Sequence, residues 1–284
     1  MYSIIQGKSK DLGGFSVKRI IPQTGRRTVG PFVFIDHMGP AQFAAGDGIN
    51  VRPHPHIGLA TLTYLFTGQM LHQDSLGSIQ EIIPGDVNWM VAGSGIVHSE
   101  RETIEVRSQP HAMNGLQCWV ALPPEQADIA PAFTHVAAAS LPSYYHEGIA
   151  ARIILGEAWG YQAPAQTYSP VFFIDVLMQS GSTMKLPHPQ YETGLYVVDG
   201  IVELAQQSFS QGSFIFIEGE YEISAEENAR VVVLGGATLP QQPLLDWNFV
   251  AYERATIEAA IQRWRQGEFD TIPTDYAESI PYPG

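Results

Sequence analysis

Two pairs of candidate metal ligands stand out in the first half of the chain. His54 and His56 are two residues apart, and so are His98 and Glu100. Side chains at positions i and i+2 of a strand point to the same face, with Cα atoms about 6.5–7 Å apart. From that spacing two imidazoles can reach one ion at the roughly 2.0–2.1 Å of a metal–nitrogen bond. Two such pairs facing each other across a barrel would give one ion three imidazoles and one carboxylate.

Short strands must position these pairs, because strand-like segments dominate the sequence. They are rich in β-branched and aromatic residues and are bounded by Gly, Pro, Asp or Asn, which is typical of an antiparallel barrel or sandwich. The predicted strands are Val17–Ile21, Phe32–Asp36, Ala60–Phe66, Ile79–Ile83, Val87–Val91, Gln117–Leu122, Ala151–Leu155, Val171–Met178, Gly194–Val198, Ile201–Leu204, Ser213–Ile217 and Arg230–Leu234.

The two halves of the chain share a pattern. Pro53-His-Pro-His56 precedes Gly68, and Pro187-His-Pro-Gln190 precedes Gly200, with 12 and 10 residues from the end of each motif to its glycine. This order predicts an internal duplication of one barrel. In the second copy Gln190 replaces a histidine and residues 212–222 contain none. We therefore expect one metal ion per chain, in the N-terminal barrel, and a structural role for His188.

The predicted organisation is an all-β protein with two tandem jelly-roll-like β-barrels and a C-terminal α-helix. Residues 1–124 form the barrel with the metal site, 125–148 a connecting segment and 149–240 the degenerate second barrel, followed by a strand, helix and tail over 241–284. The helix is predicted from Tyr252 to Gln266, since Ile257, Ile261 and Trp264 follow helical spacing and Gly267 stands in the stop position.

Composition excludes several classes of function. The formal net charge of −14 argues against direct nucleic-acid binding, because an acidic surface repels phosphates. The longest apolar stretches are too short to span a bilayer, so no membrane association is expected. The N-terminus lacks the apolar core of a signal peptide. Cys118 is the single cysteine, and its apolar neighbours predict a buried, inert thiol. Together these features favour a cytoplasmic protein.

Longer motifs surround the two ligand pairs. Gly48, His54, His56 and Gly68 follow the first motif of the cupin barrels, except that Thr61 stands where the usual glutamate would be. Gly85 to His98 approximates the second motif, and Glu100 follows two residues later. This chain closely resembles the pirin family in these segments: Phe34-Ile-Asp-His-Met-Gly39, Pro53-His-Pro-His-Ile-Gly58, His72-Gln-Asp-Ser75, Pro84-Gly-Asp-Val-Asn-Trp-Met90, Ala92-Gly-Ser-Gly-Ile-Val-His-Ser-Glu100 and Leu116-Gln-Cys-Trp-Val-Ala-Leu-Pro123.

The resemblance implies a bicupin with its metal in the N-terminal cupin barrel, and it maps the family's ligands onto His54, His56, His98 and Glu100. The family is linked to iron, to quercetin 2,3-dioxygenase activity in several members, and to transcriptional co-regulation in an animal member. Such a ligand set favours Fe(II), with Ni, Co, Mn, Cu or Zn as alternatives, because the bound ion depends on availability.

Two hypotheses about function follow. In the first, the protein is a metal-dependent dioxygenase, a quercetinase-like oxidoreductase that brings a flavonol or similar enol and O₂ to one ion. Glu100 would be the catalytic base that accepts the proton of the substrate hydroxyl. In the second, the protein is a non-enzymatic redox sensor whose metal state alters a surface that binds a partner protein. A cupin isomerase or sugar-binding barrel is a third, weaker hypothesis, because such proteins generally retain the glutamate that Thr61 replaces.

Other polar residues near these motifs receive separate predictions. Asp36 is a candidate partner for a ligand histidine, because such histidines usually donate their second N–H to a carboxylate or carbonyl. We expect His37 to have a packing role. His72, Asp74 and Ser75 are predicted to form a polar hairpin turn. Glu102 continues the spacing of Glu100 but lies outside the family's ligand position.

Overall fold

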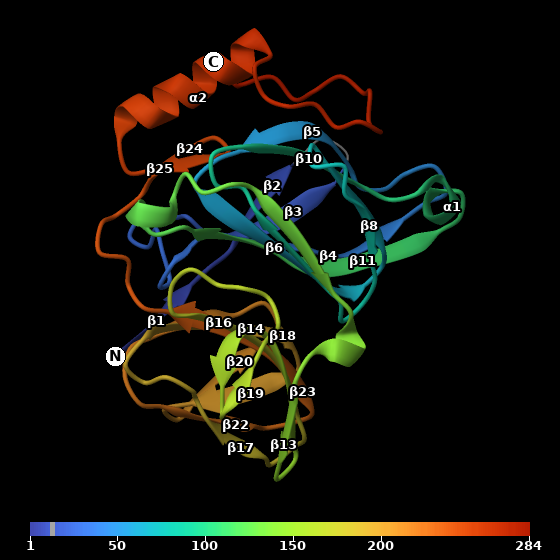
Figure 1. The fold of residues 1–284 in the computed structure, drawn as a ribbon. Helices are drawn as coiled ribbons and strands as arrows, with labels where there is room; N and C mark the ends of the chain where they lie inside the picture. The colour runs from blue at the N-terminus through green and yellow to red at the C-terminus, as the bar shows by residue number, and fades with distance from the viewer. Residues whose placement is uncertain (12–14) are drawn as a thin grey trace. The chain divides into compact units, whose positions relative to one another are not determined.

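The protein is described by a computed structural model that covers residues 1–11 and 15–284 (Figure 1). Strands dominate, and the chain forms two compact units. The histidine unit comprises Ser9–Arg19, Val33–Ala138 and Pro240–Gly284, while the companion unit comprises Met1–Lys8, Ile20–Phe32 and Ala139–Leu239. Each unit is assembled from separate stretches of sequence. Division of the chain into residues 1–124, 125–148, 149–240 and 241–284 remains a prediction.

The histidine unit is built from two antiparallel sheets. The larger has the strand order β12-β9-β6-β11-β4-β3-β2, and the smaller has the order β5-β10-β7-β8. A two-stranded sheet of β24 (Leu244–Asp246) and β25 (Phe249–Ala251) precedes the helix. The strands of the two main sheets are β2 (Lys8–Asp11), β3 (Ser16–Ile21), β4 (Phe32–Phe43), β5 (Asn50–His56), β6 (Leu59–Thr67), β7 (Met70–Asp74), β8 (Ile79–Ile82), β9 (Val87–Val91), β10 (Ile96–Arg101), β11 (His111–Ala121) and β12 (Ala132–Val136).

The companion unit repeats this plan. Its larger sheet has the order β1-β21-β18-β23-β16-β14-β13, with β15 paired to β14, and its smaller sheet has the order β17-β22-β19-β20. The strands are β1 (Tyr2–Ile5), β13 (Ser143–His146), β14 (Ile149–Ala158), β15 (Tyr161–Gln162), β16 (Val171–Met178), β17 (Thr183–Lys185), β18 (Glu192–Asp199), β19 (Ile201–Leu204), β20 (Gln207–Ser210), β21 (Phe214–Ile217), β22 (Glu222–Ala225) and β23 (Ala229–Gly236).

The strand orders of the two units correspond one to one. The smaller sheets β5-β10-β7-β8 and β17-β22-β19-β20 take their strands from the same successive positions along the chain. The same holds for β9-β6-β11-β4 and β21-β18-β23-β16. This correspondence supports the predicted duplication, and the all-β prediction with one C-terminal helix of several turns is confirmed. Among the described strands the two sheets of each unit stay separate, so each unit is a jelly-roll sandwich rather than a closed barrel.

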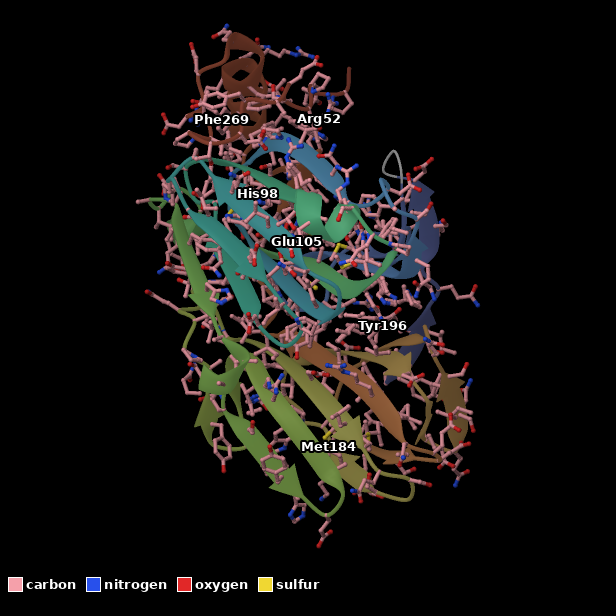
Figure 2. All side chains as sticks on the ribbon, turned by 90° about the vertical axis from the view of Figure 1, so that its right-hand side faces the viewer. Arg52, His98, Glu105, Met184, Tyr196 and Phe269 are labelled. Atoms are coloured by element: carbon pink, nitrogen blue, oxygen red, sulfur yellow. The ribbon has the colours of Figure 1, made fainter. Side chains whose placement is uncertain are left out.

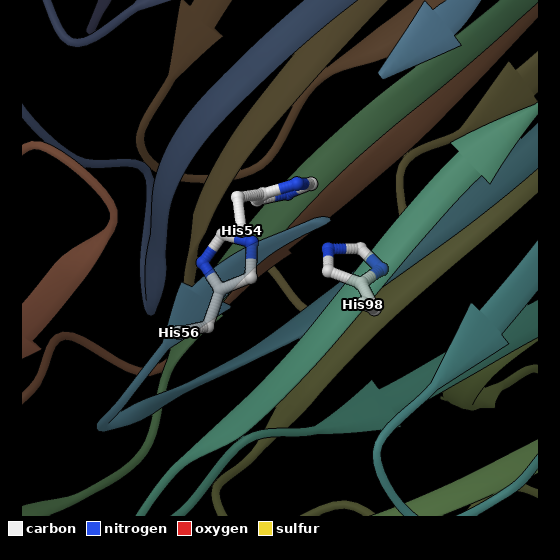
Figure 3. Close-up of side chains that lie close together, drawn as sticks. All are labelled: His54, His56 and His98. Carbon is white, nitrogen blue, oxygen red and sulfur yellow. The ribbon is translucent and has the colours of Figure 1, made fainter. Parts of the chain in front are cut away.

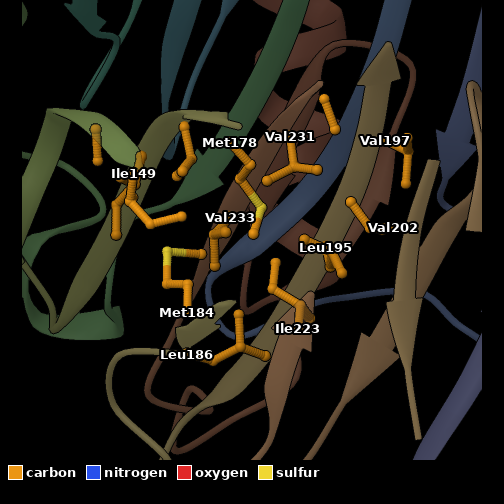
Figure 4. Packing of buried hydrophobic residues seen from close by; sticks show 14 of the residues in the cluster. Ile149, Met178, Met184, Leu186, Leu195, Val197, Val202, Ile223, Val231 and Val233 are labelled. Carbon is orange, nitrogen blue, oxygen red and sulfur yellow. The ribbon is translucent and has the colours of Figure 1, made fainter. Parts of the chain in front are cut away.

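The core of the companion unit is apolar throughout. Ile174, Val176, Leu195, Val231 and Val233 are buried together, and Figure 4 shows several of them meeting between the strands. Each such side chain contributes about 1.5–3 kcal/mol when removed from water. This unit is stabilised by hydrocarbon packing, and the core contains no histidine among the described buried residues.

The segment predicted as a connection carries two strands. Within residues 125–148, β12 pairs with β9 and β13 pairs with β14. The predicted strands also do not include β5, β7 and β10. These three strands carry His54, His56, His72, His98 and Glu100. Pro53 and Pro55 lie inside β5, and proline within a run argues against a strand because it cannot donate to the ladder.

The C-terminal helix α2 spans Arg254–Gln266, beginning two residues after the predicted start. Its buried face consists of Ile257, Ala260 and Ile261, which pack with Phe249 of β25. Figure 1 shows α2 in red beside β24 and β25. No helix among the described residues is long and apolar enough to cross a membrane.

Gly267 ends this helix in the left-handed conformation, with φ at 70°. A Cβ there would meet no atom within 4 Å, so only backbone strain opposes a side chain. We expect Gly267→Ala to lower the free energy of unfolding by roughly 1–2 kcal/mol. Gly267→Asn should cost less, because asparagine tolerates this conformation. Urea unfolding of both variants tests this, and equal stability of the alanine variant and the parent would contradict it.

Candidate metal centre

Strands β5 and β10 bring the histidines together. The two strands are neighbours in the smaller sheet, where His98 pairs with His54 and Ile96 pairs with His56. Beyond His98 the register shifts, so that Glu100 pairs with Val51. The extra residue of β5 falls at Arg52 and Pro53, where a ladder hydrogen bond is lost because proline has no N–H. The bulge therefore places Glu100 opposite Val51, where unbroken pairing would place it opposite Arg52.

Three imidazoles converge on one space. Potential ligand nitrogens of His54, His56 and His98 all lie within 4.8 Å of one another, and all three residues are buried. The ring centroids are 4.4 Å apart for His54 and His98 and 5.0 Å apart for the other two pairs. Figure 3 shows the rings gathered around this space, and Figure 2 places His98 among the strands of the histidine unit. This is the one group of three or more such ligands among the described residues.

Backbone carbonyls orient two of these rings. His54 Nδ1 donates to the carbonyl oxygen of Arg52 at 2.9 Å. His56 Nδ1 donates to the carbonyl oxygen of Asn248 at 3.0 Å. Because each proton lies on Nδ1, each Nε2 keeps a lone pair for a metal ion.

The third ring carries an unsatisfied buried atom. His98 Nε2 is buried and has no hydrogen-bond partner among the described residues. A buried polar atom without a partner costs roughly 1–3 kcal/mol, and coordination to a metal ion would satisfy it. The residues present therefore fit a divalent metal ion held by three neutral imidazoles.

Burial keeps these imidazoles neutral. It lowers the pKa of His54 to about 4, and it lowers the pKa of His56 and His98 well below the usual range, with neighbouring imidazoles adding to the effect. Neutral imidazole is the form that binds metal. The centre is thus in its ligating state at neutral pH without any proton loss.

These shifts predict how the stability of the metal-free protein depends on pH. Between about pH 6.5 and pH 4, His54 binds a proton in the unfolded chain but remains neutral in the folded protein. The free energy of unfolding therefore falls as the pH falls through this interval. The limit is about 1.4 kcal/mol per pH unit for each histidine. Glu100 opposes part of this loss of stability. Burial raises the pKa of its carboxyl group, so as the pH falls Glu100 is protonated more readily in the folded protein than in the unfolded chain.

Urea unfolding of the metal-free protein at neutral pH and at about pH 5 measures this dependence. A His54→Ala variant is the control, and its stability should fall less over the same interval. Identical pH dependence of the parent and the variant would show that His54 does not resist protonation in the fold.

Glu100 lies beside the imidazoles rather than in their group. It is buried, it lines the same cavity, and its Oε1 is 3.1 Å from Thr63 Oγ1, which donates to it. Burial raises the pKa of this carboxyl group. The structure thus brings together three of the four predicted ligands. Coordination by Glu100 remains a prediction, and its position fits a base facing the cavity.

The imidazoles open onto a cavity of about 640 Å³. One wall is a series of stacked groups. Trp119 meets His56 edge to face at 5.0 Å and stacks on Phe34 at 4.0 Å, while the guanidinium of Arg19 lies 4.3 Å above Phe34. The volume lies within the range of roughly 300–1,000 Å³ that is usual for small-molecule sites. Aromatic side chains therefore line the cavity next to the three imidazoles.

Segments distant in sequence also line this cavity. Trp247, Asn248 and Ile280 come from the C-terminal part of the histidine unit. Ile280 N donates to the carbonyl oxygen of Pro53 at 2.8 Å. The sequence does not indicate that these residues line the cavity, since no local pattern links Asn248 to His56.

Two predictions about nearby polar residues have clear outcomes. Asp36 does not bind a ligand histidine, because its carboxylate pairs with Arg19 at 2.8 and 2.7 Å and backbone carbonyls serve His54 and His56 instead. His37 is buried with Nε2 at 2.6 Å from Asn114 Oδ1, in keeping with the packing role predicted.

Glu102, Cys118 and His188 lie outside the group of three imidazoles. Glu102 Oε2 accepts from Ile49 N at 2.7 Å and lies 3.1 Å from His111 Nε2, away from the imidazole group. Cys118 is buried and unpaired, and burial raises the pKa of its thiol. His188 is half-buried and its Nε2 donates to the carbonyl oxygen of Glu157 at 2.7 Å, as a capped turn residue would.

The predicted polar hairpin turn exists at Ser75 and is anchored by Asp74, but the prediction was wrong for His72. His72 is buried in β7, with Nδ1 at 3.4 Å from His98 Nδ1 and Nε2 at 3.0 Å from Asp74 Oδ2. His72 and Asp74 have the same i, i+2 spacing as the two ligand pairs, and this signal would have placed them on one face of a strand.

Comparison with known proteins agrees with this centre and fold. The family model for Pirin matches residues 14–120, and the model for the Pirin C-terminal cupin domain matches residues 173–270. A pirin-like protein of Caulobacter vibrioides is 42% identical, over 99% of this chain and 98% of that protein. A putative quercetin 2,3-dioxygenase of Pseudomonas aeruginosa is 39% identical, over 90% of this chain and 81% of that protein.

A solved structure is similar along the whole chain. The crystal structure of a quercetin 2,3-dioxygenase from Acinetobacter baumannii has a TM-score of 0.91 at 31% identity, covering 100% of this chain and 95% of that chain. Both halves of the present chain thus match the two cupin domains of one family. The chain belongs to the pirin family, and it is a bicupin.

Proposed function

We propose that this protein is a mononuclear metal enzyme of the quercetin 2,3-dioxygenase type, which uses O₂ to oxidise a flavonol or a similar enol. The observation that carries the proposal is the group of His54, His56 and His98 at the wall of a 640 Å³ cavity, with His98 Nε2 unsatisfied. The names of the relatives from Pseudomonas aeruginosa and Acinetobacter baumannii support the same reaction class.

The aromatic wall would bind and orient the substrate. A flavonol is flat and largely apolar, so it can pack against the parts of Phe34 and Trp119 that line the cavity next to His56. Removing its apolar surface from water would contribute roughly 25 cal/mol per Å² buried. Binding there would displace water from the imidazoles and present the hydroxyl and carbonyl oxygens of the substrate to them.

Glu100 would remove the proton that makes the substrate oxidisable. A flavonol must lose the proton of its 3-hydroxyl group, and a buried carboxylate at the cavity wall can accept it. Because burial raises the pKa of Glu100, the carboxylate is a stronger base than an exposed one, and its pKa lies closer to the working pH. The hydroxyl of Thr63 holds the carboxylate in place at 3.1 Å.

His54, His56 and His98, with Glu100 beside them, would hold a divalent metal ion, which would supply Lewis-acid stabilisation of the negative charge on the deprotonated substrate oxygen. We favour Fe(II), and Ni, Co, Mn, Cu and Zn also suit imidazole and carboxylate ligands. A cytoplasmic location belongs to the same proposal.

The regulatory hypothesis makes a different demand on the cavity. A metal centre that only signals to a protein partner needs no room for a substrate, so a cavity closed to anything larger than water would favour it. The observed 640 Å³ cavity with an aromatic wall favours the enzyme instead.

Reconstitution tests the proposed reaction. The metal-free protein is loaded anaerobically with Fe(II), and in parallel with each alternative ion, before quercetin and O₂ are added. We expect the flavonol absorbance to fall only in the metal-loaded samples, and a His98→Ala variant treated identically should remain inactive. Absence of metal-dependent turnover with every ion would refute the dioxygenase and favour a regulatory role.

A further inference from the structure

A buried chain of three side chains extends from the imidazole group into β7. His98 Nδ1 lies 3.4 Å from His72 Nδ1, and His72 Nε2 lies 3.0 Å from Asp74 Oδ2. All three residues are buried. The ring of Phe133 stacks on His72 at 4.3 Å with an angle of 7° between the planes, which fixes the orientation of that imidazole.

Asp74 determines the direction of its hydrogen bond with His72. Its Oδ1 accepts from Leu76 N at 2.9 Å and from Ser78 N at 3.0 Å, so the turn after β7 anchors the carboxylate. Burial alone would raise the pKa of Asp74, but hydrogen bonds from His72 and Ser78 outweigh it and lower that pKa. An ionised carboxylate only accepts. His72 Nε2 must therefore carry the proton and donate to Asp74.

The second hydrogen bond follows from the first. In a neutral imidazole one nitrogen donates and the other accepts, so His72 Nδ1 presents a lone pair towards His98. His98 Nδ1 must then carry the proton that lies between the two rings. His98 Nε2 is left with a lone pair, and it is the buried nitrogen that has no hydrogen-bond partner among the described residues. Figure 3 shows the His98 ring beside the other two imidazoles.

We propose that His72 and Asp74 are positioning residues that fix the tautomer of His98, so that its Nε2 is ready to bind the metal ion. His54 and His56 reach the same tautomer through the carbonyl oxygens of Arg52 and Asn248. Among the described residues no carbonyl accepts from His98, and a second imidazole backed by a carboxylate takes that role. The proposal rests on the metal centre of the proposed function, while its first test does not require a bound metal.

Asp74→Asn is the variant that discriminates most sharply, because it keeps the shape of the side chain. The two backbone N–H groups of Leu76 and Ser78 require an acceptor, so the amide oxygen would face the turn. The amide NH₂ would then face His72 and donate to its Nε2. His72 would have to carry its proton on Nδ1 and His98 on Nε2, so every tautomer in the chain reverses and the metal-binding nitrogen is blocked.

Two measurements test the proposal. Two-bond ¹H–¹⁵N correlation spectra of the metal-free, ¹⁵N-labelled protein at neutral pH report which ring nitrogen carries each proton. We expect His98 protonated on Nδ1 in the parent protein and on Nε2 in Asp74→Asn. Titration with Co(II) followed by visible absorption should show affinity reduced about 10–100-fold in the variant. Gln73→Ala is the matched control on the same strand, since the Gln73 amide donates outward to Thr274, and it should change neither result.

Several results would overturn the proposal. One is a parent spectrum with His98 protonated on Nε2, or with His72 protonated on both nitrogens. Another is an Asp74→Asn protein with reversed tautomers and unchanged Co(II) affinity. Because the parent spectrum is a test by itself, misfolding of the variant would not protect the idea. If the parent shows the expected tautomers but binds no metal, the proposed function fails and the assignment of His98 as a metal ligand fails with it.

Discussion

Replacement of His98 by alanine is expected to remove the metal ion from the protein. Only three imidazoles converge in the described structure, and His98 supplies the nitrogen that has no other partner. With two imidazoles left, the metal affinity should fall by at least about 100-fold, more than the loss typical of altering a supporting residue. The chain should still fold, because the alanine leaves β10 and its neighbours paired.

Metal analysis after equilibration with Fe(II) or Co(II) and gel filtration measures this loss. The matched control is His188→Ala, because His188 occupies the position of His54 in the duplicated sequence and its Nε2 donates to a backbone carbonyl. The control should keep about one ion per chain. Equal metal content in the two variants would show that the three imidazoles are not the binding site.

Replacement of Glu100 by glutamine should greatly slow turnover without removing the metal ion. The amide has the shape of the carboxylate and can still accept from Thr63, but it cannot take the proton of the substrate hydroxyl group. Loss of a general base typically lowers the rate by about 10²–10⁴-fold. We therefore expect kcat to fall by that factor while the three imidazoles retain the ion.

The companion variant Glu102→Gln separates this effect from a general loss of buried charge. Glu102 is a buried glutamate two residues further along, but it binds Ile49 N and lies near His111. Its replacement should leave kcat close to that of the parent. Full activity of Glu100→Gln would show that another group accepts the proton, and loss of metal from that variant would show that Glu100 acts chiefly as a ligand.

The spacing of residues along the sequence was sufficient to identify the three converging histidines. The i, i+2 repeats at His54 and His98 identified residues on the faces of two strands, and these strands pair with each other in the structure. Spacing could not reveal the bulge at Pro53, which depends on a missing backbone donor and on the partner strand. Spacing alone treats the four residues as equivalent ligands, whereas the group of converging ligand atoms in the structure consists of the three imidazoles.

Non-local contacts account for most of what the sequence did not predict. Asn248 supplies its carbonyl to His56 from 192 residues away, and no pattern of residues encodes a backbone acceptor. His72 was predicted in a turn because its neighbours are polar, although burial against Phe133 and His98 places it in the interior. The strands β12 and β13 exist because they pair with β9 and β14, which their own mixed composition did not suggest.

The fold itself was the easier prediction. The strands β9, β16 and β19 have the predicted bounds, since each is a mostly apolar segment with turn-forming residues close to its ends. Duplication was visible in the motifs around His56 and Gln190, and strand order supports it. The composition of the chain does not indicate which segments belong to which unit, because buried apolar residues occur in both units.

The most direct test of the central claim is an anomalous-scattering experiment on crystals of the protein grown with Fe(II) or Co(II). The account predicts one strong peak per chain, bound by His54, His56 and His98, with Glu100 at the same ion or facing it across the cavity. A peak in the companion unit, or no peak between these imidazoles in crystals whose protein retains metal in solution, would contradict it.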